Sequence, residues 1–226
     1  MSNAQHRCGF VAVVGRPNVG KSTMINAIVG RKVSIVTPKP QTTRHRILAV
    51  HNEANCQVVF VDTPGLHQNA AKAMNRMMNR TAANALLDAD LVLLVCEADR
   101  WTSEDDAVLT RVRESGKPAI AVLNKIDRSK QKDDLLSSIA AMNERHQFQE
   151  IVPLSAKSGD NLERLLGLLP TYLPESPPLF PADMVSDRND LFRAAELIRE
   201  KLTLELRHEL PYGLTVQIER FDEEAE

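Results

Sequence analysis

The chain has 226 residues, 43% of them hydrophobic and 26% charged, which is enough for one sizeable domain and an appendage. Its net charge of −2 excludes a globally basic nucleic-acid-binding protein, so any such partner must contact a local patch. No apolar run approaches the roughly 18 residues of a membrane span, and the N-terminus is polar. The three cysteines lack the spacing of metal ligands. We therefore expect a cytoplasmic protein with reduced thiols.

Apolar runs alternate along the chain with stretches that are compatible with helices. The expected strands are 10–14, 47–51, 57–61, 91–96, 119–123 and 151–154. The expected helices are 21–29, 71–87, 103–115, 133–146 and 161–169. The polar turn at 52–55 predicts that the second and third strands form an antiparallel hairpin at the sheet edge. We therefore expect a three-layer α/β fold with a mostly parallel six-stranded sheet, which binds ligands at the carboxyl ends of its strands.

The first expected strand runs into a loop that matches the phosphate-binding pattern G-x-x-x-x-G-K-S in full. The loop consists of Gly15, Arg16, Pro17, Asn18, Val19, Gly20, Lys21, Ser22 and Thr23. Its glycines let successive N–H groups turn toward a polyphosphate, and the helix that follows adds the positive end of its dipole. Lys21 would reach the β- and γ-phosphates, and the Ser22 hydroxyl would bind Mg²⁺. The alternative is a plain glycine turn between strand and helix.

Residues 31–46 are rich in basic side chains and contain no acidic one. Pro38 and Pro40 argue against regular secondary structure in this segment. We interpret it as a loop that closes over the γ-phosphate, with Thr42 or Thr43 giving its hydroxyl to Mg²⁺. A solvated loop is the simpler alternative, and both interpretations can hold.

A short motif follows the third expected strand immediately. It consists of Asp62, Thr63, Pro64 and Gly65. Asp62 can hold Mg²⁺ through water, and the Gly65 N–H can sense the γ-phosphate. Aspartate and glycine often end strands, so the motif alone is weak evidence for a Mg²⁺ site. Its position after the phosphate-binding loop makes that interpretation stronger.

The motif after the fifth expected strand predicts which base is bound. It consists of Asn124, Lys125, Ile126 and Asp127. The Asp127 carboxylate can accept hydrogen bonds from guanine N1–H and the 2-amino group, whereas adenine would leave it unpaired, which gives roughly 10⁴-fold discrimination. Lys125 would lie along the base, and Asn124 would connect this loop to the phosphate-binding loop. The alternative interpretation of the whole motif is a polar turn between strand and helix. A weaker motif, whose middle N–H can donate to guanine O6, follows the last strand and consists of Ser155, Ala156 and Lys157.

Five prolines lie between positions 170 and 181, which predicts a semi-rigid linker. Beyond it, apolar residues at helical spacing predict a helix over 191–210, and alternation predicts a strand over 214–218. One helix and one strand are too little for an independent core. We therefore expect three regions: a nucleotide-binding domain over 1–169, a linker over 170–187 and an incomplete second domain over 188–226.

Taken together, the motifs occur in the order and spacing of the Ras-like GTPase superfamily. The stretches GRPNVGKST, PKPQTTRHR, VDTPGLH, IREK, ELPY and IERF resemble the bacterial Era-like family over essentially the whole chain. The resemblance implies a P-loop GTPase fold and a second domain of the KH type, of which this chain has the first helix and strand. It implies a slow GTP-hydrolysing switch that uses GTP, GDP and Mg²⁺, acts in small ribosomal subunit assembly and contacts 16S ribosomal RNA near its 3′ end. It also implies a cytoplasmic monomer that associates with the inner membrane at most peripherally.

This sequence departs from the pattern at the RNA clamp. A KH domain clamps RNA with a G-x-x-G loop, and no glycine follows Gly213, which predicts weakened or lost RNA binding.

Many GTPases orient the attacking water with a glutamine. At that position this chain has Leu66, as does the family it resembles, and a leucine side chain cannot orient or polarise the water. Related potassium-dependent GTPases use an asparagine at the position of Asn18 as a K⁺ ligand, the alternative being an ordinary polar loop residue. The residues expected to serve hydrolysis are Lys21, Thr43, Gly65 and Asn18. By analogy with unassisted GTPases, turnover is expected at roughly 10⁻⁴–10⁻² s⁻¹.

Two classes of function remain open at this point. In the first, the protein is an enzyme whose turnover times an assembly cycle. In the second, it is a GTP-gated module that binds RNA or the ribosome, and hydrolysis only ends the bound state. Another bacterial assembly GTPase is a further alternative. A P-loop ATPase or kinase is the most distant one, because Asp127 has no use for adenine.

Overall fold

The structure is a computed structural model, and it describes the chain except for residues 1–5, 40–41, 66–72, 129–131, 207–213 and 221–226. Its strands are β1 (Arg7–Val14), β2 (Ile47–Glu53), β3 (Cys56–Asp62), β4 (Leu91–Glu97), β5 (Ala119–Asn124) and β6 (Glu150–Pro153). Its helices are α1 (Lys21–Val29), α2 (Ala73–Asp88), α3 (Ser103–Ser115), the 3-10 helix η1 (Ile126–Arg128), α4 (Lys132–Arg145), α5 (Leu162–Tyr172) and α6 (Asp190–Glu205). Every strand and helix expected up to residue 169 is present.

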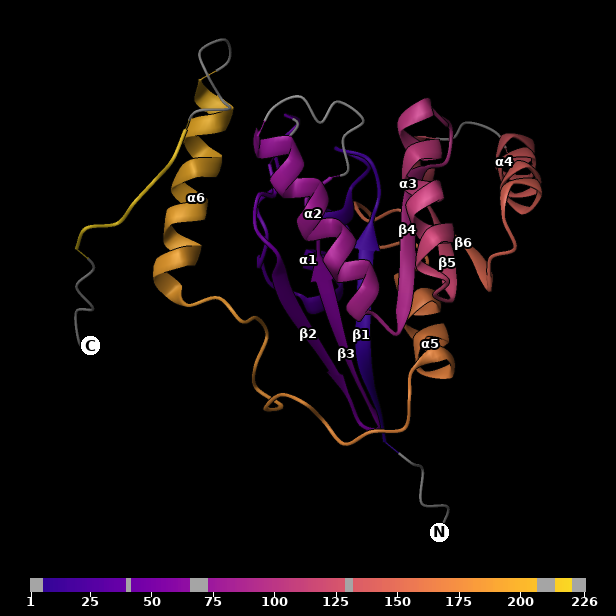
Figure 1. Cartoon of the computed structure of the whole chain (residues 1–226), viewed down its shortest axis with the longest axis horizontal. Coiled ribbons are helices and arrows are strands. Elements are labelled where there is room, and N and C mark those ends of the chain that lie inside the picture. The colour runs from indigo at the N-terminus through magenta and orange to yellow at the C-terminus, as the bar shows by residue number, and fades with distance from the viewer. Residues whose placement is uncertain (1–5, 40–41, 66–72, 129–131, 207–213, 221–226) are drawn as a thin grey trace.

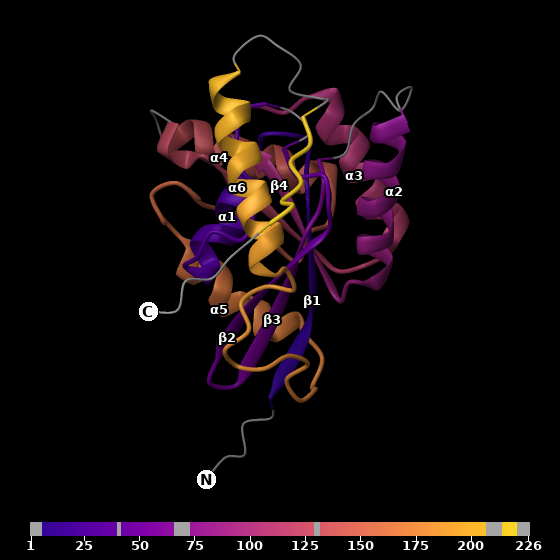
Figure 2. The ribbon, with the colours of Figure 1, turned by 90° about the vertical axis from the view of Figure 1, so that its left-hand side faces the viewer.

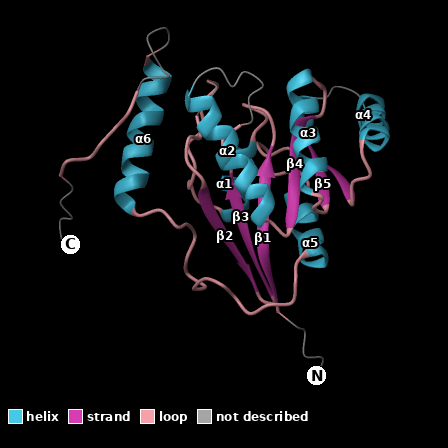
Figure 3. Cartoon of the chain, in the orientation of Figure 1, coloured by secondary structure: helices cyan, strands magenta, loops and turns pink. Residues whose placement is uncertain are grey.

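The six strands form one sheet in the order β2-β3-β1-β4-β5-β6. All neighbouring strands are parallel except β2 and β3, which form the expected antiparallel hairpin. β3 and β4 are apolar runs buried over nearly their whole length, because helices cover both faces of the sheet. The prediction of a three-layer α/β fold is confirmed (Figure 1 and Figure 3).

Alternate residues of β1 face two separate cores, as the two-residue period of a strand requires. Val11 and Val13 pack in the core that α1 and α5 cover. Ala12 and Val14 pack in the core that α2 and α3 cover. α4 adds Met142 to a smaller cluster with residues of β4 and β5. The three cysteines are buried and free, as expected for core thiols.

Two expectations about the C-terminal part are wrong. The proline-rich stretch predicts a linker from 170 onward, but α5 includes Pro170 and ends at Tyr172. Proline is tolerated there because it removes only one hydrogen bond near the helix end, and the buried Leu173 holds this turn in the core. Residues 214–218 form no strand, since no described strand pairs with them. Residues 207–210 of the expected last helix lie outside the described residues.

After α5 the chain runs along the β2 edge of the sheet to α6 (Figures 1 and 2). Val50 N donates to Val185 O at 2.9 Å, and Ser186 forms an antiparallel bridge with Ala49. These contacts hold the linker against β2. Helix α6 then lies beside the sheet, outside the three layers (Figure 1). Within the part of the chain that the structure describes, no helix is long and apolar enough to cross a membrane.

Candidate nucleotide-binding site

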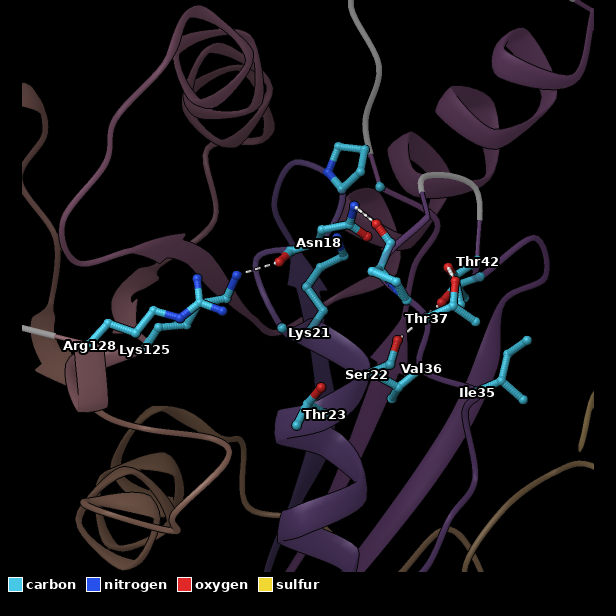
Figure 4. A pocket seen from close by; sticks show the side chains of 15 residues that line it. Asn18, Lys21, Ser22, Thr23, Ile35, Val36, Thr37, Thr42, Lys125 and Arg128 are labelled. Atoms are coloured by element: carbon cyan, nitrogen blue, oxygen red, sulfur yellow. Dashed lines mark hydrogen bonds between the residues drawn. The ribbon is translucent and has the colours of Figure 1, made fainter. Parts of the chain in front are cut away.

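The loops that carry the predicted motifs gather at the carboxyl ends of the parallel strands. The phosphate-binding loop follows β1, the Asp62 motif ends β3, the Asn124 loop follows β5, and residues 155–157 follow β6. A cavity of about 350 Å³ opens at this edge of the sheet (Figure 4). Its lining consists of Pro17, Asn18, Gly20, Lys21, Ser22, Thr23, Ile35, Val36, Thr37, Pro38, Thr42, Thr43, Gly65, Lys125 and Arg128.

Two positions of the phosphate-binding loop require glycine, because a side chain there would clash with neighbouring atoms. A Cβ at Gly15 would lie 2.3 Å from Val95 O, and one at Gly20 would lie 2.3 Å from Asn124 Nδ2. Gly20 also has a φ of 102°, a left-handed conformation that other residues rarely adopt. The loop therefore packs against β4 and the Asn124 loop, and a larger residue would fit at neither position.

Lys21 is buried at the base of the cavity, with 6% of its surface exposed. Its Nζ donates to the Gly15 and Arg16 carbonyl oxygens at 2.9 Å each. Burial disfavours the charged ammonium and lowers the pKa of Lys21 to about 8, although the nearby Asp62 acts in the opposite direction. A bound phosphate would favour the protonated form, so this lysine is suited to an anionic ligand.

Three side-chain oxygens with the chemistry of Mg²⁺ ligands meet at the start of α1. Ser22 Oγ donates to Asp62 Oδ2 at 2.9 Å and lies 3.0 Å from Thr43 Oγ1. Asp62 Oδ1 and Ser34 Oγ are buried and make no hydrogen bond of normal geometry within the described residues, although the Ser34 hydroxyl lies close enough to Asp62 to oppose the rise in its pKa. Burial raises the pKa of the Asp62 carboxyl, an effect that a cation would oppose. One carboxylate and two hydroxyls fit a Mg²⁺ ion that also binds substrate phosphates.

Within the basic segment 31–46, the structure favours Thr43 over Thr42 as the candidate ligand. Thr42 Oγ1 donates to Lys39 O at 2.6 Å and lies 2.7 Å from Thr37 Oγ1, so its hydroxyl is used inside the segment. Thr43 instead faces the serine hydroxyl of α1. The described residues of this segment form neither helix nor strand, as predicted.

The helix α6 contacts the same segment from outside. Glu200 accepts a hydrogen bond from Val36 N at 2.9 Å and forms an ion pair with Lys32. Arg199 donates to Thr42 O at 2.5 Å. Sequence reasoning missed these contacts, because the apolar spacing of α6 says nothing about which partner its charged residues meet.

The motif after β3 is held against the phosphate-binding loop. Thr63 Oγ1 donates to Val13 O at 2.7 Å. A Cβ at Gly65 would lie 2.9 Å from Pro17 N, so only glycine fits at this lining position. Leu66 lies outside the described residues, and its effect on the attacking water stays a prediction.

Asn124 ties the loops together, as the sequence predicts. Its Nδ2 donates to Val19 O at 2.8 Å, and its Oδ1 accepts from Lys125 N at 2.8 Å and from Ala156 N at 2.9 Å. The Ala156 N–H is therefore bonded to Asn124 in this structure, whereas the sequence predicts that it donates to guanine O6. Lys125 Nζ donates to Asn18 O at 2.7 Å, which adds a second link to the phosphate-binding loop (Figure 4).

Asp127 lies exposed in η1, where a base could reach it. Its Oδ1 accepts a hydrogen bond from Ser155 Oγ at 2.6 Å. This bond lowers the pKa of the Asp127 carboxyl, so the group is ionised at neutral pH. A fixed, ionised acceptor of this kind matches guanine and not adenine. The role of the Ser155 hydroxyl is one that the motif alone does not reveal.

Eleven of the predicted site residues do not line this cavity. They are Gly15, Arg16, Val19, Asp62, Thr63, Pro64, Asn124, Asp127, Ser155, Ala156 and Lys157. Sequence reasoning missed the lining residues Ile35, Val36, Thr37 and Arg128. It also missed Glu97 at the end of β4, which pairs with both loops, because an acidic residue at a strand end has no distinguishing pattern.

Comparison with known proteins identifies the relatives of this chain. Residues 10–125 match the profile of a family described as "50S ribosome-binding GTPase". The chain is 50% identical over 222 residues to GTPase Era of Pseudomonas aeruginosa, a match that covers 98% of this chain and 73% of that protein. It is 47% identical over 219 residues to GTPase Era of Marinobacter nauticus, covering 97% of this chain and 72% of that protein.

Two solved structures share the fold at a TM-score of 0.87 and 40% identity, covering 91% of this chain and 70% of each of those chains. One is Era in complex with MgGDPNP and nucleotides 1506–1542 of 16S ribosomal RNA. The other is a variant of Aquifex aeolicus Era bound to GDP·AlF4⁻. The family description names the large ribosomal subunit, whereas the first complex contains RNA of the small one. The profile matches residues 10–125 alone, so relatives that match nearly the whole chain are the more specific guide.

Proposed function

Because this chain belongs to the Era family of GTPases, we propose that it is a GTP-hydrolysing switch that acts in the assembly of the small ribosomal subunit. In this proposal the GTPase domain extends to the end of α5 at Tyr172, the stretch from there to 187 is the linker, and 188–226 form part of a KH-type RNA-binding domain. The protein would work as a cytoplasmic monomer with at most peripheral contact with the inner membrane.

The observation that carries the GTP-hydrolysing part of this proposal is that side chains suited to phosphate and to Mg²⁺ meet at one site: Lys21, Ser22, Thr43 and Asp62. Lys21 and the loop amides would bind the polyphosphate. A Mg²⁺ ion held by the three oxygen-bearing residues would neutralise charge on the β- and γ-phosphates. Asp127 would select guanine. The Era complexes with MgGDPNP and with GDP·AlF4⁻ support the same ligand set.

The Asn18 side chain is the proposed K⁺ contact during hydrolysis. Its Nδ2 donates to Pro38 O at 2.8 Å, and its side-chain oxygen makes no hydrogen bond to a described residue. Carbonyl-type oxygens are the groups that replace the hydration shell of K⁺ in proteins. Hydrolysis should therefore be faster in KCl than in NaCl, and Asn18→Ala should remove the difference. Equal rates in the two salts would exclude this role.

The ribosomal part of the proposal is tested with RNA. The 16S fragment 1506–1542 bound by the Era relative is the natural probe. In filter or gel-shift binding, this chain should bind the fragment weakly, as the missing G-x-x-G loop predicts, and more tightly with a non-hydrolysable GTP analogue than with GDP. Equal binding in the two nucleotide states, or none in either state while GTP hydrolysis is normal, would remove the GTP-gated RNA contact from the proposal and leave the GTPase assignment in place.

A second candidate function is a GTP-gated binding module in which hydrolysis is only the release step. It is favoured by the contacts of α6 with the Thr43-bearing segment, which in this proposal would meet the γ-phosphate. A Thr43→Ala variant should bind GTP and hydrolyse it poorly. If cells that carry this variant still mature small subunits, turnover is not the essential act and the second candidate is correct.

A further inference from the structure

The strand order places the end of β4 between two nucleotide-binding loops. β4 lies between β1 and β5, so its last residue, Glu97, has the phosphate-binding loop on one side and the Asn124 loop on the other. Glu97 is in register with Asn124, and Ala98 N donates to Asn124 O at 2.9 Å. On the opposite side, Gly15 packs closely against the β4 backbone at Val95.

The Glu97 carboxylate contacts both loops at once. Its Oε2 accepts from Arg16 of the phosphate-binding loop, and its Oε1 accepts from Lys125 of the Asn124 loop. The side chains of Glu97, Arg16 and Lys125 are 11%, 10% and 18% exposed, so solvent screens these pairs little. Burial would raise the pKa of Glu97, but hydrogen bonds from Lys125 and Arg16 outweigh it and lower the pKa, which keeps the group ionised.

The neighbouring carboxylate cannot take the place of Glu97. Arg16 Nε also donates to Asp105 Oδ2 at 3.0 Å. That same oxygen accepts from the Thr102 N–H and hydroxyl at 2.9 Å each, which caps the start of α3. Among the described residues, Glu97 alone forms ion pairs with cations of both loops.

We propose that Glu97 is a positioning residue for the guanine nucleotide: through Arg16 and Lys125 it fixes the phosphate-binding loop relative to the base-binding loop, and so limits the rate of nucleotide release. The inference rests on the proposed guanine-nucleotide site. Glu97 does not line the cavity, so it acts through the two loops and not on the phosphates. A nucleotide that contacts both loops dissociates most slowly when the free protein already holds the loops at the separation that the nucleotide requires.

The test measures how fast nucleotide leaves a Glu97→Gln variant. Fluorescent GDP and a fluorescent non-hydrolysable GTP analogue are displaced by excess unlabelled nucleotide in a stopped-flow instrument. Loss of the charge-assisted hydrogen bonds should speed release of both by about ten- to a hundredfold. Single-turnover hydrolysis of GTP already bound should keep its wild-type rate. Glu114→Gln, on the exposed surface of α3, is the matched control and should release nucleotide at the wild-type rate.

A double-mutant cycle separates positioning from a general loosening of the fold. If Glu97 acts through Lys125, the combination of Glu97→Gln with Lys125→Met should release nucleotide more slowly than the two separate effects multiplied together. Fully multiplicative effects, or wild-type release from Glu97→Gln, would overturn the proposal. Should Glu97→Gln fail to fold, Glu97→Asp keeps the charge on a shorter side chain and should show an intermediate rate, and a wild-type rate there would overturn the proposal equally.

Binding by the wild-type chain distinguishes the role of Glu97 from the guanine-nucleotide site itself. A wild-type chain that binds neither fluorescent nucleotide would contradict the guanine-nucleotide site itself. Normal binding by the wild type, with equal release from Glu97→Gln, would remove only the role of Glu97.

Discussion

At the residue scale, the proposed choice of base rests on the Asp127 carboxylate and its contact with Ser155. The serine hydroxyl donates to one carboxylate oxygen at 2.6 Å, and the rest of the carboxylate is exposed. Because this hydrogen bond favours the ionised form, the side chain presents acceptors only. Guanine offers two donors to such a group, and adenine offers an acceptor in the same place.

Replacing this carboxylate by an amide should change the preferred base. We expect Asp127→Asn to lose about 10⁴-fold in GTP affinity and to prefer xanthosine triphosphate, whose 2-oxo group accepts from the new amide. Competition against fluorescent GDP measures both affinities. Asp183→Asn, an exposed change in the linker, is the control. Unchanged GTP affinity in Asp127→Asn would refute the assignment of this residue.

The buried Lys21 should make nucleotide binding depend on pH. Its free pKa is about 8, because burial favours the neutral amine, whereas a bound phosphate requires the ammonium. GTP affinity should therefore be nearly constant below pH 7.5 and fall as pH rises through 8, with proton uptake on binding at pH 8.5. Calorimetry in two buffers of different ionisation enthalpy measures the uptake. Constant affinity without proton uptake over this range would contradict the assignment.

At the element scale, α6 meets the basic segment with its polar face. Arg199, Glu200 and Thr203 are at most 5% exposed, whereas Leu191 and Ile198 are 44% and 46% exposed. An amphipathic helix ordinarily buries its apolar stripe. The part of segment 31–46 that α6 contacts presents backbone groups and a lysine side chain. The charged side chains of α6 can pair with these groups.

Removing one polar contact of α6 should loosen the segment that carries Thr43. We expect Glu200→Ala to speed hydrogen exchange at the Val36 amide by about tenfold, since that N–H loses a charged acceptor. Ile198→Ala changes the exposed face of the same helix and should leave the exchange unchanged. Exchange is measured by mass spectrometry of peptides that cover residues 31–39. An equal response in the two variants would show that α6 does not hold the segment through its polar face.

The strands of the sheet could be predicted from the sequence, because a strand that is buried on both faces is a continuous apolar run. The run at 57–61 is such a case, and the polar turn at 52–55 predicted the hairpin. The choice between Thr42 and Thr43 could not be predicted, since two adjacent hydroxyls fit the same motif and only the backbone path separates them. Glu97 could not be predicted either, because its importance comes from the strand order.

At the scale of the whole molecule, the site joins loops that follow strands spread across the sheet. The loops after β1, β3 and β5 are far apart in the chain, and hydrogen bonds such as Ser22 to Asp62 and Asn124 to Val19 connect them. A nucleotide that bridges these loops binds only the folded chain. Its binding should therefore be visible as stability of the whole domain.

We expect GDP at a hundred times its Kd to stabilise the folded chain by about 2.7 kcal/mol. For a protein of this length, that corresponds to a rise in Tm of roughly 5–10 °C. Differential scanning calorimetry with Mg²⁺ present measures the shift. ADP at the same concentration should give none, and an equal rise with ADP would contradict a guanine-selective site.

The most direct measurement is competition between GTP and ATP for the purified protein in magnesium buffer. Fluorescent GDP is bound first, and each nucleotide is titrated in at neutral pH. We predict that GTP displaces the probe at least about 10⁴-fold more effectively than ATP, because the Asp127 carboxylate would accept hydrogen bonds from guanine and not from adenine. Displacement by ATP at concentrations similar to those of GTP would contradict the central claim, and the ribosomal role built on it.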